Sequence, residues 1–335
     1  KEILTKILER KYEVLSTPEN INTLIGIARL ILEKLKLSHQ VFVAEIGAYR
    51  RGDTRQVSEL IKPQIGILTG LNEQHLERFG SMENIVATES ELLEELPKGG
   101  TAILNRDDKY YVESARHLAK GAKLITFSLE TKRAGSFEIE SLEITESGSK
   151  FTLKDQSGTN YNFSTKLLGK HNIANIMMAI LAACALGIDL KEISEAVLTI
   201  EPPEHRLKPI VRENDIIILD DSYNINPDGA RVALEVLSLF KERRKIVMTH
   251  GLVELGKLEE KINREFGESL AKVADLVIAA GPKANLIFDG LKASNFPVTQ
   301  VIIAADYKDA QKKLWQIARP KDVILIQTDL PDSYY

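Results

Sequence analysis

The stretch QVFVAEIGAYRRGDTRQVSELIKPQIGILTG, residues 40–70, contains the pattern that decides the fold. Two mostly apolar runs, QVFVAEIG and IGILTG, flank an amphipathic segment near 54–61. Continuous rather than alternating apolar runs are typical of parallel strands that helices cover on both faces. The stretch therefore predicts a strand, a helix and a second strand parallel to the first.

The same alternation extends in both directions through the first half of the chain. Helices are expected near 24–36 and 83–96, and YEVLS, TAILN and KLITFS are expected to be further strands of the same sheet. Between about 132 and 166 the period becomes two, with turns at ESGS and QSGT, which indicates antiparallel hairpins appended to that sheet. Helices are expected to follow at about 171–187 and 190–199.

The second half repeats the alternation with the runs DIIILDD, KIVMTH, LVIAA, VTQVIIA and DVILIQ, which predicts a second doubly wound sheet. Helices are expected between these runs, among them 227–241, 257–274 and 306–318. The most proline-rich stretch, EPPEHRLKP, lies between the halves, and domain boundaries favour such linkers. We therefore expect two α/β domains, residues 1–203 and 204–335.

Composition limits the class of protein. With 335 residues, 44% of them hydrophobic, 27% charged and a net charge of −4, the chain has the balance of an ordinary globular protein. Its scattered Lys and Arg residues offer no basic face to nucleic acid or to an anionic membrane, which favours small-molecule partners. The one cysteine, Cys184, lies in the apolar run IMMAILAACALG and is expected to be a reduced core thiol, as in a cytoplasmic protein.

The chain opens with KEILTKILERK, which has the pattern of a helix from its first residue, with no capping residue before it. The charged opening lacks the apolar core of a secretory signal. An uncapped start leads us to expect that further sequence precedes residue 1.

Candidate metal ligands lie where the predicted strands of the first sheet end, because ligands bind beyond the carboxyl ends of parallel strands. Glu45 ends QVFVAEIG, and His75 follows ILTGLN, so the two side chains are expected to converge on a divalent cation. A helix cap or a solvated surface group is the alternative for each. Glu89 shares a helix face with three apolar residues, where a lone carboxylate is costly, so it is a third candidate unless the helix turns it to solvent.

Candidate nucleotide-binding residues occur in both halves. In GKHNIAN, Asn172 and Asn175 lie on one helix face and offer amides to a planar base, although capping alone also explains Asn172. In DDSYNINP, the residues Asp221, Tyr223 and Asn224 occupy the loop between a strand and a helix. Arg206 in the linker is expected to reach the cleft between the domains, with an ordinary surface arginine as the alternative.

These segments together resemble the Mur ligase family, and within it the branch that adds D-alanyl-D-alanine. The resemblance covers nearly the whole chain and is carried, in order, by STPENINTLIG, AEIGAYRRGD, TGLNEQHLERFGS, ELLEELPKGGTAILNRDD, LLGKHNIANIMMAI, RLKPI, LDDSYNINPDGARVALEVL and VELG. It implies a central ATPase domain with a parallel sheet and a β-hairpin insert, followed by a Rossmann-like α/β domain that closes over the nucleotide.

The resemblance also implies roles for single residues. Glu45 and His75 match magnesium ligands, Asn172 and Asn175 match residues around the adenine, and Tyr223 matches the residue beside the base. Arg206 and Asp221 match contacts to phosphate and ribose from the closing domain. The loop that faces the acceptor substrate is matched by Asn20, Asn22 and Thr23.

The chain departs from the family pattern at several positions. The family's phosphate-binding Walker loop would end where Lys1 begins, so this chain alone is expected not to hydrolyse ATP. Glu89 stands where the family carbamylates a lysine, and a glutamate carboxylate is expected to replace the carbamate as a metal ligand. Three further departures are Gly70 for an Asn, Gly251 for an Asp and Gln327 for a Lys.

The activity implied is that of an ATP-dependent ligase of peptidoglycan precursor synthesis. Magnesium-bound ATP would phosphorylate a carboxylate of a UDP-N-acetylmuramoyl-peptide, and a dipeptide such as D-Ala-D-Ala would then form the amide. Arg206 and Glu89 are the expected catalytic residues, and the protein is expected to be a cytoplasmic monomer. The alternatives are a Mur-like ligase with another substrate, a folylpolyglutamate synthase, in which DSYNINP is not expected, and a non-catalytic binding subunit.

Overall fold

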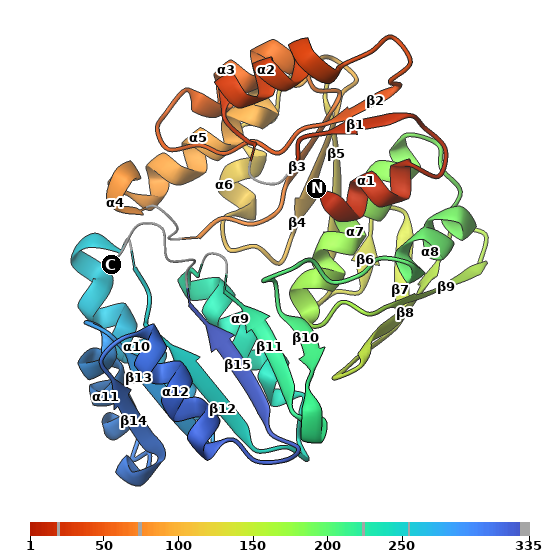
Figure 1. Cartoon of the computed structure of the whole chain (residues 1–335). Helices are drawn as coiled ribbons and strands as arrows, with labels where there is room; N and C mark the ends of the chain where they lie inside the picture. Colours follow the sequence, from red (N-terminus) through yellow and green to blue (C-terminus); the bar gives the residue numbers. More distant parts are fainter. Residues whose placement is uncertain (19–20, 73–75, 223–224, 254, 329–335) are drawn as a thin grey trace.

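The computed structural model describes residues 1–18, 21–72, 76–222, 225–253 and 255–328. Figure 1 shows two α/β parts, one above the other: residues up to about 200 form the upper part and the residues from about 208 form the lower part. No helix in these described ranges is long and apolar enough to cross a membrane.

The upper part contains a two-stranded parallel sheet and a seven-stranded sheet. Its strands are β1 (Val14–Ser16) and β2 (Val41–Val43) in the first sheet, and β3 (Ile65–Leu68), β4 (Thr101–Asn105), β5 (Lys123–Ser128), β6 (Arg133–Ala134), β7 (Phe137–Thr145), β8 (Gly148–Lys154) and β9 (Asn160–Thr165), in this spatial order, in the second. Strands β3 to β5 are parallel, and β5 to β9 are antiparallel neighbours, so the appended hairpins are confirmed.

One expectation for this part is corrected. Within the described residues, no ladder joins β2 to β3, so the first five apolar runs do not form one continuous sheet. Val43 of β2 nevertheless lies in the same apolar core as Ile103 of β4. The apolar runs indicated strands packed against helices, but apolar character alone does not specify which strand pairs with which.

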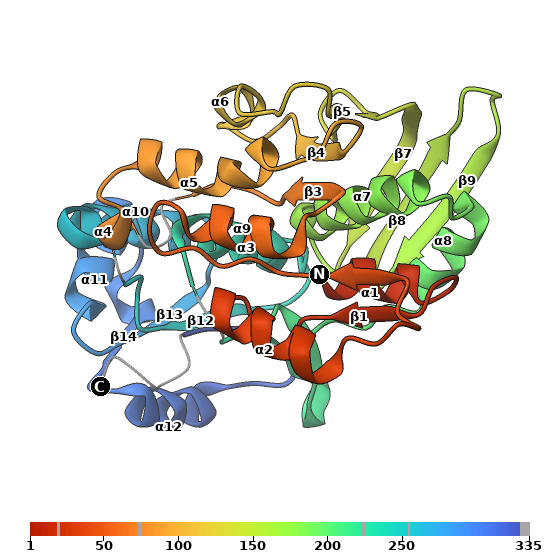
Figure 2. The same cartoon turned by 90° about the horizontal axis from the view of Figure 1, so that it is seen from above.

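Eight helices are described in the upper part: α1 (Glu2–Leu8), α2 (Leu24–Lys34), α3 (Asp53–Ile61), α4 (Leu76–Phe79), α5 (Met82–Glu94), α6 (Tyr111–Ala115), α7 (Lys170–Ala185) and α8 (Leu190–Leu198). Side-chain oxygens of Thr23, Ser81 and Asp189 accept hydrogen bonds from the first turns of α2, α5 and α8, which is why these helices begin there. Seen from above in Figure 2, α7 and α8 lie beside the hairpin strands β7 to β9.

The lower part has one six-stranded sheet, in the order β10 (Lys208–Val211), β11 (Ile217–Asp221), β15 (Val323–Gln327), β12 (Lys245–Thr249), β13 (Leu276–Ala280) and β14 (Val301–Ala304). All neighbours are parallel except β10, which runs antiparallel to β11. Residues 208–211 therefore form an edge strand that the sequence did not lead us to expect, and proline is compatible with such a strand.

Helices cover both faces of this sheet. On one face, Val247 of β12 packs in a core with α9 (Pro227–Ser238), α10 (Glu259–Leu270) and α11 (Ala284–Ala293). On the other face, Ile246 and Met248 of the same strand pack with α12 (Tyr307–Ile317). Neighbouring residues of one strand thus enter opposite cores, as the doubly wound fold requires. Short 3-10 turns, at Glu213–Asp215, Gly256–Leu258 and Val298–Gln300, complete the part.

The two parts are in direct contact. Leu168, which precedes α7, lies in the core of the lower part, and a Cβ atom at Gly169 would approach Val236 Cγ2 of α9 to 2.7 Å. Gly169 has a φ of 86°, so both its backbone and its surroundings favour glycine. Asn72 Nδ2 also donates to Asn226 Oδ1 at 3.3 Å, which joins the loop after β3 to the start of α9.

Candidate active site

Glu45 follows β2 and projects from the carboxyl edge of the small sheet. Its backbone N–H donates to Thr17 Oγ1 at 3.1 Å, which holds together the loops that follow β1 and β2. Its side chain is 46% exposed, and Oε2 lies 3.5 Å from Nζ of the buried Lys1. An exposed carboxylate at this edge is accessible to a cation, including one that also binds a phosphate. His75, its expected partner, lies outside the described residues.

The loop expected to face the acceptor lies beside the Glu45 loop. Gly47 donates its backbone N–H to the carbonyl oxygen of Asn22 at 2.9 Å, and a Cβ atom at Gly47 would lie only 2.6 Å from Asn22 Nδ2. Glycine therefore permits the close approach that brings Asn22 and Glu45 to the same edge. Thr23 is the N-cap of α2 and accepts from Gly26 N–H, so it has a structural role; Asn20 lies outside the described residues.

Glu89 lies on α5 one turn after the buried Ile85, whereas Leu96 follows the end of this helix and packs in a separate cluster. Among the described residues its carboxyl has no hydrogen bond or ion pair, and burial, together with the charge of Glu91, raises its pKa to about 7. A carboxyl that no protein group neutralises is suited to a cation, whose charge would favour the ionised form. Within the described ranges, which leave out His75, no group of three or more His, Cys, Asp and Glu residues is arranged to hold a metal ion.

Glu91, two residues further along α5, was not singled out from the sequence. It is 2% exposed and accepts hydrogen bonds from the backbone N–H groups of Gly52, at 3.0 and 3.2 Å, and Arg55, at 3.0 Å. Its carboxylate therefore caps α3 from a neighbouring helix. Gly52, the N-cap of α3, has no side chain that could cap this helix. This glycine was the signal in the sequence that another residue has to provide the cap.

The first turn of α7 carries the residues expected around a base. Asn172 Nδ2 donates to the carbonyl oxygen of Leu168 at 2.8 Å and so braces the turn next to the lower part. The N-cap of α7 is Gly169, and no side chain caps this helix, so the capping alternative for Asn172 is wrong. Asn175 lies one turn further along and is partly buried. In the same first turn, His171 Nδ1 is buried without a hydrogen-bond partner among the described residues, and burial lowers the pKa of this imidazole to about 4.

On the lower part, Asp221, Gln327 and Thr249 end three adjacent strands, β11, β15 and β12, at the same register. Gln327 is fully buried and donates Nε2 to Asp221 Oδ2 at 3.2 Å, while its Oε1 has no partner in the described part of the chain. Gln327 thus orients the carboxylate of Asp221 through a hydrogen bond where a lysine would do so through charge. Tyr223 and Asn224 lie outside the described residues.

The departure at Gly251 has a local structural cause. Gly251 has a φ of 89°, and a Cβ atom there would lie 2.6 Å from Oδ1 of the buried Asn263. Asn263 in turn accepts from Leu252 N–H and donates to Leu252 O, at 2.8 and 2.9 Å. An aspartate at position 251 would require this loop to adopt another conformation.

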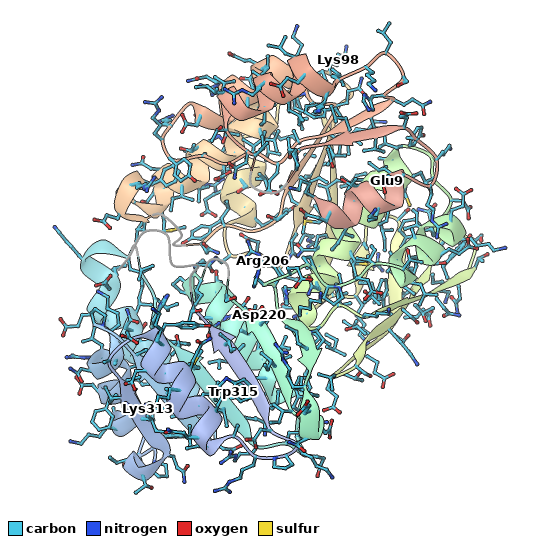
Figure 3. The ribbon with its side chains drawn as sticks, in the orientation of Figure 1. Glu9, Lys98, Arg206, Asp220, Lys313 and Trp315 are labelled. Carbon is cyan, nitrogen blue, oxygen red and sulfur yellow. The ribbon has the colours of Figure 1, made fainter. Side chains whose placement is uncertain are left out.

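Arg206 lies in the linker and is exposed; Figure 3 shows it in the space between the two parts, near the end of β11 that carries Asp220. Its neighbours, which the sequence did not single out, form a small network. His205 Nδ1 lies 2.9 Å from Asp220 Oδ2 and 3.1 Å from Ser222 Oγ, and Ser222 Oγ donates to Asp220 Oδ1 at 2.6 Å. The network attaches the linker to the carboxyl end of β11.

Comparison with known proteins identifies the class. The profile of the Mur ligase middle domain matches residues 1–183, and that of the Mur ligase glutamate ligase domain matches residues 205–328. The chain therefore belongs to the Mur ligase family. Its two domain types are the two that the resemblance implied.

Among its relatives are three proteins named UDP-N-acetylmuramoyl-tripeptide:D-alanyl-D-alanine ligase. That of Buchnera aphidicola is 30% identical over 77% of this chain and 56% of its own length, and that of Escherichia coli is 29% identical over 86% and 63%. The Bacillus subtilis protein is 26% identical over 98% of this chain and 69% of its own length. The chain thus spans little more than half of the first of these relatives and less than two thirds of the second.

Solved structures agree with the fold. MurF from Acinetobacter baumannii superposes with a TM-score of 0.86 at 25% identity, covering 98% of this chain and 70% of that one. MurF ligase from Thermotoga maritima, solved in complex with ADP, superposes with a TM-score of 0.82 at 23% identity, covering 98% and 73%. The relation between the sheets and helices described above is therefore that of the Mur ligase fold.

Proposed function

We propose that this chain is the ATPase and closing region of an ATP-dependent ligase that adds D-alanyl-D-alanine to a UDP-N-acetylmuramoyl-tripeptide during peptidoglycan precursor synthesis. The observation that carries the proposal is family membership over both domains, together with relatives that share this one name. Residues 1–203 and 204–335 are the two proposed domains, which the separate sheets support.

The chemistry of such a ligase has two steps. An oxygen of the acceptor carboxylate attacks the γ-phosphorus of ATP, and the bond to the bridging oxygen breaks, so that ADP leaves and an acyl phosphate forms. The amine nitrogen of the dipeptide then attacks the acyl carbon, an amide forms, and inorganic phosphate and one proton are released. Both steps develop charge on phosphoryl oxygens, which cationic groups must stabilise.

The proposed roles of single residues follow the family resemblance. Asn172 and Asn175 on α7 and Tyr223 on the lower domain would bind the base, and Asp221 with Asn224 the ribose side of the nucleotide. Arg206 is the only one of the proposed residues that brings a cation from the linker, and its guanidinium would stabilise phosphoryl charge. Asn22 and its neighbours Asn20 and Thr23 would bind the acceptor near Glu45, since the two loops touch.

Glu45, His75 and Glu89 are the proposed magnesium ligands. The exposed carboxylate of Glu45 and the carboxyl of Glu89, which has no partner among the residues that the structure describes, are hard oxygen ligands, which suit this ion. When bound, magnesium would supply charge neutralisation at the phosphates. A glutamate at position 89 would act without carbamylation, because its own carboxylate presents two anionic oxygens.

The proposed setting is the cytoplasm, where ATP and UDP-linked precursors are available, with the protein acting as a monomer. We propose no nucleic-acid or membrane partner, because Lys and Arg are scattered along a chain with a net charge of −4.

The test is a reconstituted reaction with the complete gene product, Mg-ATP, UDP-N-acetylmuramoyl-tripeptide and D-Ala-D-Ala. Phosphate release should require both substrates, and mass spectrometry should detect the pentapeptide product. Arg206→Ala should reduce kcat at least about 10²-fold, because one group that stabilises transition-state charge is typically worth that much. Lys321→Ala, on the far side of the lower domain, is the matched control.

Two other results would overturn the proposal in different ways. Turnover with another acceptor or amine, and none with these substrates, would assign the chain to a Mur-like ligase of different specificity. Nucleotide binding without phosphate release, over a panel of acceptors and amines, would identify a binding subunit.

A further inference from the structure

The backbone around Arg206 has an unusual conformation. His205 and Leu207, which flank it, have φ values of 57° and 55°, in the left-handed region that residues other than glycine rarely adopt. Two such residues within three positions form a tight arch with Arg206 at its centre. Non-glycine residues persist in this region only where neighbouring groups hold them.

Both flanks of the arch are attached to the lower domain. His205 Nδ1 bonds to Asp220 Oδ2 at 2.9 Å and lies 3.1 Å from Ser222 Oγ, both at the end of β11. Asp220 is itself 15% exposed, so its carboxylate is a stable anchor for an N–H donor. On the other side, Leu207 is 5% exposed and lies in the core of the lower domain.

The three polar residues do not form a nucleophilic triad. Such a triad needs the serine at one imidazole nitrogen and the carboxylate at the other. Here Ser222 Oγ and Asp220 Oδ2 are both bonded to Nδ1, and the Ser222 hydroxyl donates to Asp220 Oδ1. The network is arranged to hold the linker rather than to activate the hydroxyl.

We propose that His205 is a positioning residue that clamps the Arg206 arch to the lower domain, so that the guanidinium moves with this domain and is held toward the upper one. The role of Arg206 in this statement rests on the proposed function. The clamp itself rests only on the arch conformation, the His205–Asp220–Ser222 network and the burial of Leu207. Holding an arginine in place before the nucleotide arrives reduces the entropy lost on binding.

Two substitutions separate the clamp from the backbone conformation. His205→Asn keeps both properties, because asparagine tolerates the left-handed region and its Nδ2 replaces the Nδ1–H donor. His205→Gly keeps the conformation and removes the hydrogen bonds. Lys321→Gly is a matched control, since Lys321 is another non-glycine residue of the lower domain with a left-handed φ, 68°.

The first measurement needs no ligand. Trypsin cleaves after Arg206, and the rate of cleavage at the Arg206–Leu207 bond reports how often the arch opens. We expect cleavage to be about tenfold faster in His205→Gly, the ratio for one lost charge-assisted hydrogen bond, and unchanged in His205→Asn and Lys321→Gly. Cleavage after Arg212, in the same digest, should be equal in all four proteins. Unchanged cleavage at Arg206 in His205→Gly would overturn the clamp.

The second measurement is ATP affinity and turnover of the complete gene product. His205→Gly should raise the Kd for ATP or lower kcat about five- to tenfold, His205→Asn should restore it, and His205→Gly should have no further effect when combined with Arg206→Ala. Equal, additive losses in the two backgrounds would show that His205 does not act through Arg206 and would overturn the inference. Wild-type affinity and turnover in Arg206→Ala would instead overturn the proposed role of Arg206, and the clamp would be judged on the trypsin rates.

Discussion

Glu91 and Glu89 lie two residues apart on α5 and face different surroundings. Glu91 is almost completely buried, yet its carboxylate accepts hydrogen bonds from the N–H groups of Gly52 and Arg55. Glu89 keeps more of its surface, has no partner among the described residues, and has a pKa raised to about 7. The two neighbouring carboxyl groups thus differ in their hydrogen-bond partners, and a buried polar group without such partners is costly.

The two carboxyl groups of this helix also differ in what they contribute to the stability of the fold. Glu91 contributes to the fold, because it fixes the start of α3 and so the loop between Glu45 and α3. Glu89 costs the fold free energy at neutral pH, because burial disfavours its ionised form. The same contrast applies to His171, whose buried Nδ1 has no partner among the described residues.

The largest effect is expected for Glu91→Ala. It leaves the first N–H groups of α3 unsatisfied in a buried site, and the free energy of unfolding should fall by about 4 kcal/mol, since each charge-assisted hydrogen bond contributes about 1.5–3 kcal/mol. Urea unfolding at pH 7.5 measures it. Arg55→Ala is the control: it removes partly exposed ion pairs to Glu94 and Glu95 but keeps the backbone bond, and should cost at most about 1 kcal/mol. Equal losses in both variants would contradict the assignment.

A smaller effect is expected from His171, as a dependence of stability on pH. Its folded-state pKa of about 4 lies below the ordinary 6.5, so the unfolded chain binds the extra proton between these values. Stability is therefore present above pH 6.5 and is lost as pH falls toward 4, by up to about 3 kcal/mol from this group. Between pH 7 and pH 4, the free energy of unfolding of His171→Leu should therefore fall by up to about 3 kcal/mol less than that of the wild type, as measured by chemical unfolding. If the free energies of unfolding of the two proteins changed equally with pH, the imidazole of His171 would be solvent-exposed.

The smallest effect is expected for Glu89, whose contribution to stability falls as pH rises, opposite to that of His171. The pKa of Glu89 is raised from 4.5 to about 7, so the folded state binds the extra proton, and stability present below pH 4.5 is lost as pH rises through 7. In a chelator at pH 8, Glu89→Gln should therefore be more stable than the wild type by about 2 kcal/mol, since an amide is still costly to bury. Glu91→Gln should be less stable than the wild type under the same conditions. Destabilisation of Glu89→Gln would indicate a protein partner for this carboxylate.

The periodicity of single segments was sufficient for most helices and strands. The helices expected near 24–36, 54–61 and 83–96 are found at Leu24–Lys34, Asp53–Ile61 and Met82–Glu94. Pairing was harder to predict: apolar runs do not encode their neighbours, which is why the separate β1–β2 sheet and the antiparallel edge strand β10 were not expected.

By itself, the sequence determined most of the helices and strands, the succession of two α/β parts along the chain, and which polar residues follow several of the strands. These properties depend on residues close in the chain. The tertiary structure alone decided that Glu91 caps α3, that His205 holds the arch around Arg206 through Asp220 and Ser222, and that Gln327 is bonded to Asp221. Hydrogen bonds between residues 15 to 106 positions apart depend on the packing of whole elements, and no local pattern specifies them.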